Sequence, residues 1–248
     1  MDATIKVRHA MASIRPNVSG HPFWIQCRRE LVRWVQVNQI EDFRDCPIIM
    51  QTMNVGQGGY TDIELEQLPE SYHHILHKYK DTDDFSGNSI HHAYHIYQYE
   101  LRAGRSIADF DVIVEFGGGF GETCRMVHEL GFTGQYYIFD FPEFAVLQEY
   151  YLDTHLDDYK CVWNADMETV AECDLLIAEW SLSEAPEHER KPFLDIKSKN
   201  YLMAYGFDFF GQDNNDFFDT FKEKKDIKWD NFPIAHQDNK SAYLIGYS

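Results

Sequence analysis

Basic residues are scarce in this sequence. The chain of 248 residues holds 22 Lys and Arg against 41 Asp and Glu, which gives a formal net charge of −19 at pH 7. A protein that follows a nucleic-acid backbone needs a basic surface to neutralise phosphates, and an anionic membrane attracts polybasic segments. We therefore expect no nucleic acid and no membrane among the partners, and we expect a small-molecule substrate instead.

Long apolar runs and paired cysteines are also absent. No run approaches the roughly 20 residues that span a bilayer, and residues 1–19 lack the apolar block of a secretory signal. The five cysteines are scattered without a C-x-x-C pair, so the sequence indicates neither a disulfide framework nor a zinc knuckle. We expect a cytoplasmic protein whose cysteines are reduced and mostly buried.

Charge divides the chain into two regions. Residues 1–105 hold 11 basic and 13 acidic side chains, whereas residues 106–248 hold 11 basic and 28 acidic ones. The first region reads as helical, with segments expected over 21–45 (stopped by Pro47), 70–80 and 89–102. We interpret residues 1–105 as a helical cap that selects the substrate. A homodimer is left open.

From residue 111 onward, short apolar runs alternate with helical stretches. Strand-like runs occur at 112–114, 136–139, 161–163, 175–177, 201–205, 227–229 and 242–245. Helical stretches over 122–130 and 142–152 separate the earlier runs, a rhythm that predicts an α/β fold with a parallel, doubly wound sheet. No long helix separates the last two runs, so they should form an antiparallel pair at the sheet edge.

A glycine-rich segment, Glu115-Phe-Gly-Gly-Gly-Phe-Gly121, follows the first strand and opens a helix. Its G-x-G-x-G spacing differs from a dinucleotide fingerprint, which would need glycine where Glu122 stands, next to a docked pyrophosphate. About 20 residues later Asp140 ends the next strand, where a carboxylate can accept the ribose hydroxyls. The pattern favours a ligand with a cationic part, S-adenosylmethionine. The alternative is a tight turn with an incidental strand-end Asp.

Three motifs carry a resemblance to a known family. Residues 114–121, residues 137–143 with Gln148, and residues 174–184 resemble successive motifs of class I methyltransferases, and specifically the sugar O-methyltransferase family, over residues 88–248. The resemblance implies a Rossmann-like, seven-stranded sheet with an antiparallel last strand, and methyl transfer to a hydroxyl, most often on a sugar. The expected cofactor-binding residues are Glu115, Gly117, Gly119, Gly121, Asp140, Phe141, Asp166, Met167 and Glu179.

Within that set, Asp166 could accept from the adenine amino group with Met167 against the ring; the alternative for Asp166 is a helix N-cap.

An alcohol must lose a proton during methyl transfer, so we expect a general base near the acceptor. Glu184 follows the fourth strand and borders the expected methyl-transfer site; its alternative role is a helix-capping box with Ser181. His91 and His92 lie on the helix before the first strand, and His236 lies between the last two strands. Packing or solvated positions are the alternative for each histidine.

A metal is not expected. Asp208, Asp213 and Asp216 could supply oxygen ligands, but their spacing is better explained by a solvated acidic loop.

We therefore expect an S-adenosylmethionine-dependent O-methyltransferase that acts by in-line displacement with help from a general base. The alternatives are a small-molecule N-methyltransferase, a catalytically silent methyltransferase-like binding or regulatory subunit, and, disfavoured by Glu122, an NAD-dependent oxidoreductase.

Overall fold

The computed structural model describes residues 2–15, 19–53, 58–82, 85–163, 170–237 and 240–248. Within these ranges no helix combines the length and the apolar character that a membrane crossing requires. The five cysteines are free, and four of them are buried, as the sequence predicts.

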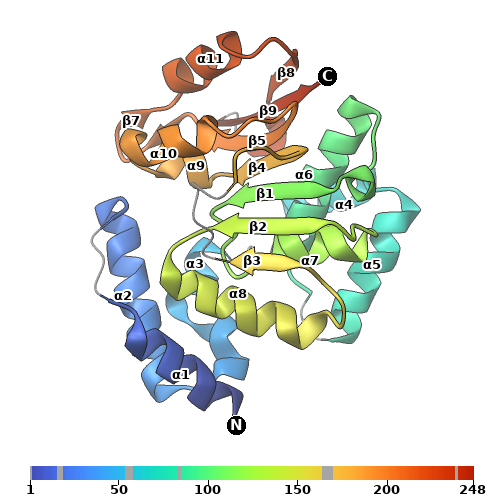
Figure 1. Cartoon of the computed structure of the whole chain (residues 1–248). Helices are drawn as coiled ribbons and strands as arrows, with labels where there is room; N and C mark the ends of the chain where they lie inside the picture. The colour runs from blue at the N-terminus through green and yellow to red at the C-terminus, as the bar shows by residue number, and fades with distance from the viewer. Residues whose placement is uncertain (1, 16–18, 54–57, 83–84, 164–169, 238–239) are drawn as a thin grey trace.

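A seven-stranded sheet forms the centre of the described part of the chain (Figure 1). Its strands are β1 (Val112–Phe116), β2 (Gln135–Phe139), β3 (Cys161–Trp163), β4 (Leu175–Glu179), β5 (Asn200–Gly206), β8 (Lys228–Pro233) and β9 (Ser241–Tyr247). They lie in the order β3-β2-β1-β4-β5-β9-β8, with parallel pairs from β3 to β5 and antiparallel pairs on both sides of β9. The predicted Rossmann-like sheet with an antiparallel last strand is confirmed.

Both faces of the sheet are apolar because its strands alternate between two cores. In β4, Leu175 and Ile177 belong to one core, whereas Leu176 and Ala178 belong to the other. The first face is covered by α6 (Gly87–Ala103), α7 (Glu122–Glu129) and α8 (Pro142–His155), and the second by α10 (Glu187–Leu194) and α11 (Asn215–Glu223). The central strands are therefore buried on both sides, whereas the edge strands β3 and β8 are partly exposed.

Among the described residues five α-helices precede α6, and four of them pack on α6 or α8. The five are α1 (Ala3–Ser13), α2 (Pro22–Val37), α3 (Pro47–Thr52), α4 (Tyr60–Gln67) and α5 (Glu70–Asp81). Helices α1 and α2 contact α8, α4 and α5 contact α6, and α3 packs on α2. Their buried side chains, such as Leu31 and Tyr79, belong to the same core as the first face of the sheet.

Two expectations for this region were wrong. The helix expected over 21–45 ends at Val37, and a short 3-10 helix (Ile40–Asp45) follows it. Pro47 begins α3 rather than stopping a helix, because proline at the first helical position loses no hydrogen bond. Helices α1 and α4 were not expected, since neither segment shows a strong apolar repeat.

A buried ion pair fixes α2 against α8. Arg28 donates to both oxygens of Glu143, at 2.8 and 3.1 Å, and also to the carbonyl of Ser19 at 3.0 Å. Its guanidinium lies 4.2 Å from the centre of the Phe141 ring. These contacts place the segment before α2 over the end of β2.

Because α2 shares its core with the sheet, Leu31→Ala should destabilise the whole protein. Leu31 is fully buried, so the cavity should lower the free energy of unfolding by about 2–5 kcal/mol. Urea denaturation followed by tryptophan fluorescence and by circular dichroism should give one coincident transition. Val37→Ala, at an exposed end of the same helix, is the control and should change stability by less than about 0.5 kcal/mol. Separate transitions would contradict the shared core.

Candidate functional site

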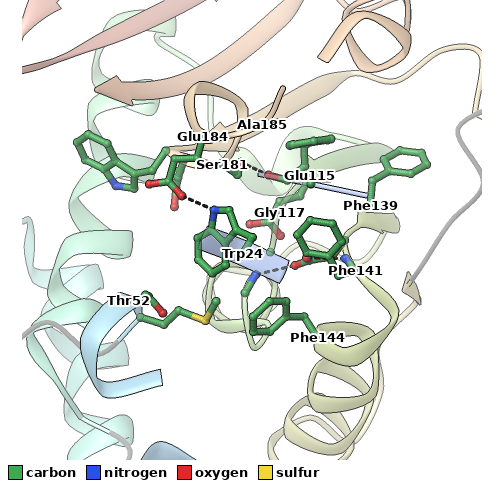
Figure 2. Close-up of a pocket in the computed structure, with 18 of the residues that line it drawn as sticks. Trp24, Thr52, Glu115, Gly117, Phe139, Phe141, Phe144, Ser181, Glu184 and Ala185 are labelled. Carbon is green, nitrogen blue, oxygen red and sulfur yellow. Dashed lines mark hydrogen bonds between the residues drawn. The ribbon is translucent and has the colours of Figure 1, made fainter. Parts of the chain in front are cut away.

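A cavity of about 770 Å³ opens at the carboxyl ends of β1, β2 and β4. The N-terminal part of α2, the end of α3 and the start of α6 close its other sides (Figure 2). Ligands of doubly wound folds bind at this edge, outside the strand ends where the strand order reverses. Here that reversal lies between β1 and β4.

The glycine segment forms the floor of the cavity. Gly117 donates its backbone N–H to the carbonyl of Phe139 at 2.8 Å, which ties the loop to β2. Its φ is +73°, and a Cβ there would lie 2.3 Å from the Cβ of Ser181. Only glycine fits this position. Gly119, Gly118 and Phe120 also line the cavity, while Gly121 precedes α7.

Asp140 lies beside the loop, as the sequence predicts. It accepts hydrogen bonds from the backbone N–H of Gly119 at 3.0 Å and of Phe141 at 2.7 Å, and from the side chain of Gln148 at 3.0 Å. Burial raises the pKa of Asp140 to about 7, although these hydrogen bonds oppose the rise. Gln148 also donates to the carbonyl of Gly119 at 2.9 Å, so it holds both the loop and the carboxylate.

Glu115 and Glu179 bring two further carboxyl groups to the cavity wall. Glu115 is buried and accepts a hydrogen bond from Tyr136 at 2.9 Å. Burial, followed by the charge of Glu179, raises the pKa of Glu115 to about 8. One oxygen of Glu179, Oε1, is buried and has no hydrogen-bond partner among the residues that the structure describes.

His92 pairs with Glu179. Its Nδ1 lies 2.6 Å from Oε2 of Glu179, and its Nε2 lies 2.8 Å from the side-chain amide of Asn88. Burial lowers the pKa of His92, but the charge and hydrogen bond of Glu179, together with Glu122 and Glu115, raise it overall to about 9. At neutral pH His92 is therefore a partner for carboxylates rather than a proton acceptor.

Glu184 ends the short helix α9 (Ser181–Glu184) and faces the cavity opposite Trp24 (Figure 2). It accepts a hydrogen bond from the indole N–H of Trp24 at 3.0 Å. Burial raises the pKa of Glu184 to about 7, against the effect of this hydrogen bond. The alternative capping box is wrong, because Ser181 is the first helical residue and its hydroxyl donates to the carbonyl of Phe116.

His91 and His236 share one buried carboxylate. Nδ1 of His91 and Nε2 of His236 each lie 2.7 Å from Oε1 of Glu64, which is in α4. The side-chain amide of Gln237 lies 3.2 Å from the other nitrogen of His91. His91 lines the cavity with its ring, which stacks on Trp180, but both of its nitrogens are held by the protein.

Other expected residues lie elsewhere. Asp166 and Met167 fall outside the described residues. Asp208 and Asp213 accept hydrogen bonds from nearby backbone N–H groups, as in ordinary turns. Among the described residues, no group of three or more His, Cys, Asp or Glu side chains could hold a metal ion.

Sequence reasoning missed Trp24 and Met53 and gave Gln148 no role. Trp24 reads as one apolar residue of an amphipathic helix, and nothing local links it to Glu184, 160 residues away. Met53 lies at the end of α3, close to Gly119. Gln148 stands eight residues after Asp140, two helical turns into α8, a spacing that could have suggested their contact.

No protein-family model matches the sequence, and no curated protein matches it. Solved structures do. A methyltransferase from Podospora anserina with bound S-adenosylhomocysteine is 12% identical over 76% of this chain and 94% of its own, with a TM-score of 0.48. Magnesium protoporphyrin IX methyltransferase from Synechocystis PCC 6803, with bound S-adenosylmethionine, is 10% identical over 90% of this chain and 97% of its own, with a TM-score of 0.48. An rRNA methylase from Escherichia coli is 10% identical over 99% of this chain and 100% of its own, with a TM-score of 0.45.

The raised pKa values predict that stability falls as pH rises from 7 to 9. Glu115, with a pKa of about 8, and His92, with a pKa of about 9, bind protons more tightly in the folded protein than in the unfolded chain. Their contribution is complete below the unfolded-state pKa values and is lost as pH rises through the folded-state values, and the loss between pH 7 and 9 is about 3 kcal/mol in total. His95 and His128 do not titrate between pH 7 and 9, because their pKa values are lowered below about 6.5.

Urea denaturation at pH 7, 8 and 9 without added ligand measures this slope. Glu115→Gln should flatten it, whereas Glu187→Gln, at an exposed position of α10, should leave it unchanged. A stability that is constant or rises over this range would refute the assignment of raised pKa values.

Proposed function

We propose that this chain is an S-adenosylmethionine-dependent O-methyltransferase that methylates a hydroxyl of a small acceptor. The observation that carries the proposal is an excess of buried carboxyl groups around a glycine loop. Glu115, Asp140, Glu179 and Glu184 line one cavity, and His92 is the paired cation among them. A sulfonium ligand with an ammonium group suits such a site, whereas a pyrophosphate does not.

The residues of the cavity fit this cofactor. Asp140 would accept the ribose hydroxyls, and the loop from Gly117 to Gly121 would let the ligand approach the backbone. The unpartnered oxygen of Glu179 offers negative charge for the cationic end. When bound, the cofactor supplies a methyl group activated by the positive sulfur.

The chain itself must place the acceptor and take its proton. Glu184 is the proposed general base, because its pKa of about 7 leaves a useful fraction ionised at neutral pH while keeping proton affinity. Trp24 orients this carboxylate through its indole N–H. His91 and His92 line the cavity, but protein groups engage their ring nitrogens, and His236 is not among the lining residues.

The acceptor class rests on the motif resemblance and on charge. The resemblance favours a sugar or a glycosylated metabolite. A net charge of −19 supports a small acceptor over a nucleic acid, whose phosphates the surface would repel. We assign residues 106–248 to cofactor binding and residues 1–105 to the cap over the acceptor, to which α2 contributes Trp24.

Cofactor binding is tested by thermal shift with Gly117→Ala. Wild-type protein should be stabilised by S-adenosylmethionine and S-adenosylhomocysteine, by about 2.7 kcal/mol at 100 times the dissociation constant, and not by NAD. Gly117→Ala should lose this shift, because its Cβ collides with Ser181.

Gly104→Ala is the matched control for Gly117→Ala. Its φ is also positive, at +63°, but its Cβ would meet nothing within 4 Å. It should lose about 1–2 kcal/mol of stability from backbone strain and keep the full ligand shift. Stabilisation by NAD alone would contradict the proposed cofactor.

Glu184→Gln tests the general base. Methyl transfer should fall by about 10²–10⁴-fold with little change in affinity for S-adenosylhomocysteine, and the wild-type rate should rise with pH to a plateau above about 7. Glu187→Gln, just beyond the same loop and exposed, is the control. Full activity of Glu184→Gln would remove this residue from the mechanism and favour N-methylation, which needs positioning more than a base.

A further inference from the structure

A row of aromatic rings leads from the protein surface into the cavity. Its outer part is the turn between β6 (Asp208–Phe209) and β7 (Gln212–Asp213), which faces the start of α2. The ring of His21 stacks on Phe210, with centres 5.3 Å apart and planes inclined by 16°, and meets the edge of Phe209 at 5.1 Å. We call His21, Phe23, Trp24, Phe209 and Phe210 the aromatic wall.

The inner part of the aromatic wall ends at the proposed base. Phe23 lies 5.5 Å from Phe210 and 5.2 Å from Trp24, measured between ring centres. The indole of Trp24 then donates its hydrogen bond to Glu184, as Figure 2 shows. Four members of the wall, all except Phe210, line the cavity directly.

Phe210 is held at a position that does not favour phenylalanine. Its side chain is 69% exposed, and its φ of +51° lies in the left-handed region. Exposure of a large apolar ring and left-handed backbone are both unfavourable for this residue type. Residues kept in such conformations cluster at ligand sites.

Two polar side chains beside the aromatic wall each hold a backbone N–H of the protein. Nδ1 of His21 accepts the backbone N–H of Phe23 at 3.2 Å, and Oε1 of Glu189 accepts the backbone N–H of Gly20 at 2.7 Å. A bare sugar ring against this wall would give up water for its hydroxyls with few replacement partners. An aromatic ring would lose no hydrogen bonds and would gain stacked or edge-to-face contacts.

We propose that the aromatic wall is the acceptor subsite for an aryl group, so that the acceptor is a hydroxylated small molecule carrying an aromatic ring, such as a glycoside with an aryl aglycone or a phenol. This inference rests on the proposed function, because Glu184 at the inner end of the wall is where the reacting hydroxyl would lie. The wall thereby selects the acceptor by its ring, and the base selects the hydroxyl.

Three glucosides that differ only in the aglycone test the proposal. Phenyl, cyclohexyl and methyl β-D-glucopyranoside are titrated into the full-length protein with saturating S-adenosylhomocysteine, and affinity is measured by calorimetry. The phenyl compound should bind at least about tenfold tighter than the methyl compound, from buried apolar area, and about two- to tenfold tighter than the cyclohexyl compound, from ring contacts. Saturation-transfer NMR should show the phenyl protons in closest contact.

Variants of Phe210 then assign the effect to the wall. Phe210→Ala and Phe210→Gly should both reduce the phenyl preference to a similar extent and leave the affinity for S-adenosylhomocysteine unchanged. Phe210→Gly should have the higher Tm of the two, because glycine adopts the left-handed backbone without strain. Leu101→Ala, an exposed apolar residue of α6, is the control and should keep the full preference.

The results separate the two proposals. Equal affinities for phenyl and methyl glucosides, or a phenyl preference that survives in both Phe210 variants, would overturn the aryl subsite even if S-adenosylhomocysteine binds. A failure of S-adenosylhomocysteine to bind would overturn the proposed function, and the order of the glucosides measured without it would still decide the subsite.

Discussion

Buried negative charge at the carboxyl end of the sheet is the constraint on which the rest of the structure depends. Glu115 is the last residue but one of β1, Glu179 ends β4, and Asp140 follows β2 directly, so the parallel strands deliver three carboxyl groups to one edge. Burial, followed by the charge of Glu179, raises the pKa of Glu115, and burial raises the pKa of Asp140. Such a cluster opposes folding unless apolar packing elsewhere compensates, and it is relieved by a ligand that carries positive charge.

The compensation comes from the two apolar cores and from the N-terminal helices. Each face of the sheet packs against its own layer of helices, and α2 joins the first core through Leu31 and the Arg28–Glu143 ion pair. The N-terminal region is thus part of the same folded unit that holds the carboxylates. It also brings Trp24 to Glu184, so that the helices which stabilise the site complete it as well.

Local signals explain what could be predicted from the sequence. Apolar runs set the strands, and the spacing from Gly117 to Asp140 identified the floor of the cavity, because both features lie within one strand–helix–strand unit. Contacts between distant segments carry no such signal. Glu64 and His236 are 172 residues apart, and α4 has too weak an apolar repeat to be recognised as a helix. The S-x-x-E spacing at Ser181 was misleading, because the carbonyl of Phe116, 65 residues away, takes the serine hydroxyl.

Contacts between distant segments also decide which candidate general base can accept a proton. A general base must face the cavity, and its pKa must lie near the working pH. His92 faces the cavity, but the carboxylates around it raise its pKa to about 9. In His91, one ring nitrogen is bonded to Glu64 and the other to Gln237. For Glu184, burial raises the pKa and the Trp24 hydrogen bond limits the rise, so the value of about 7 results from two opposed effects. Because Trp24 also belongs to the aromatic wall, a ring bound there would change the solvation of this hydrogen bond, and one indole would thereby couple acceptor binding to proton affinity.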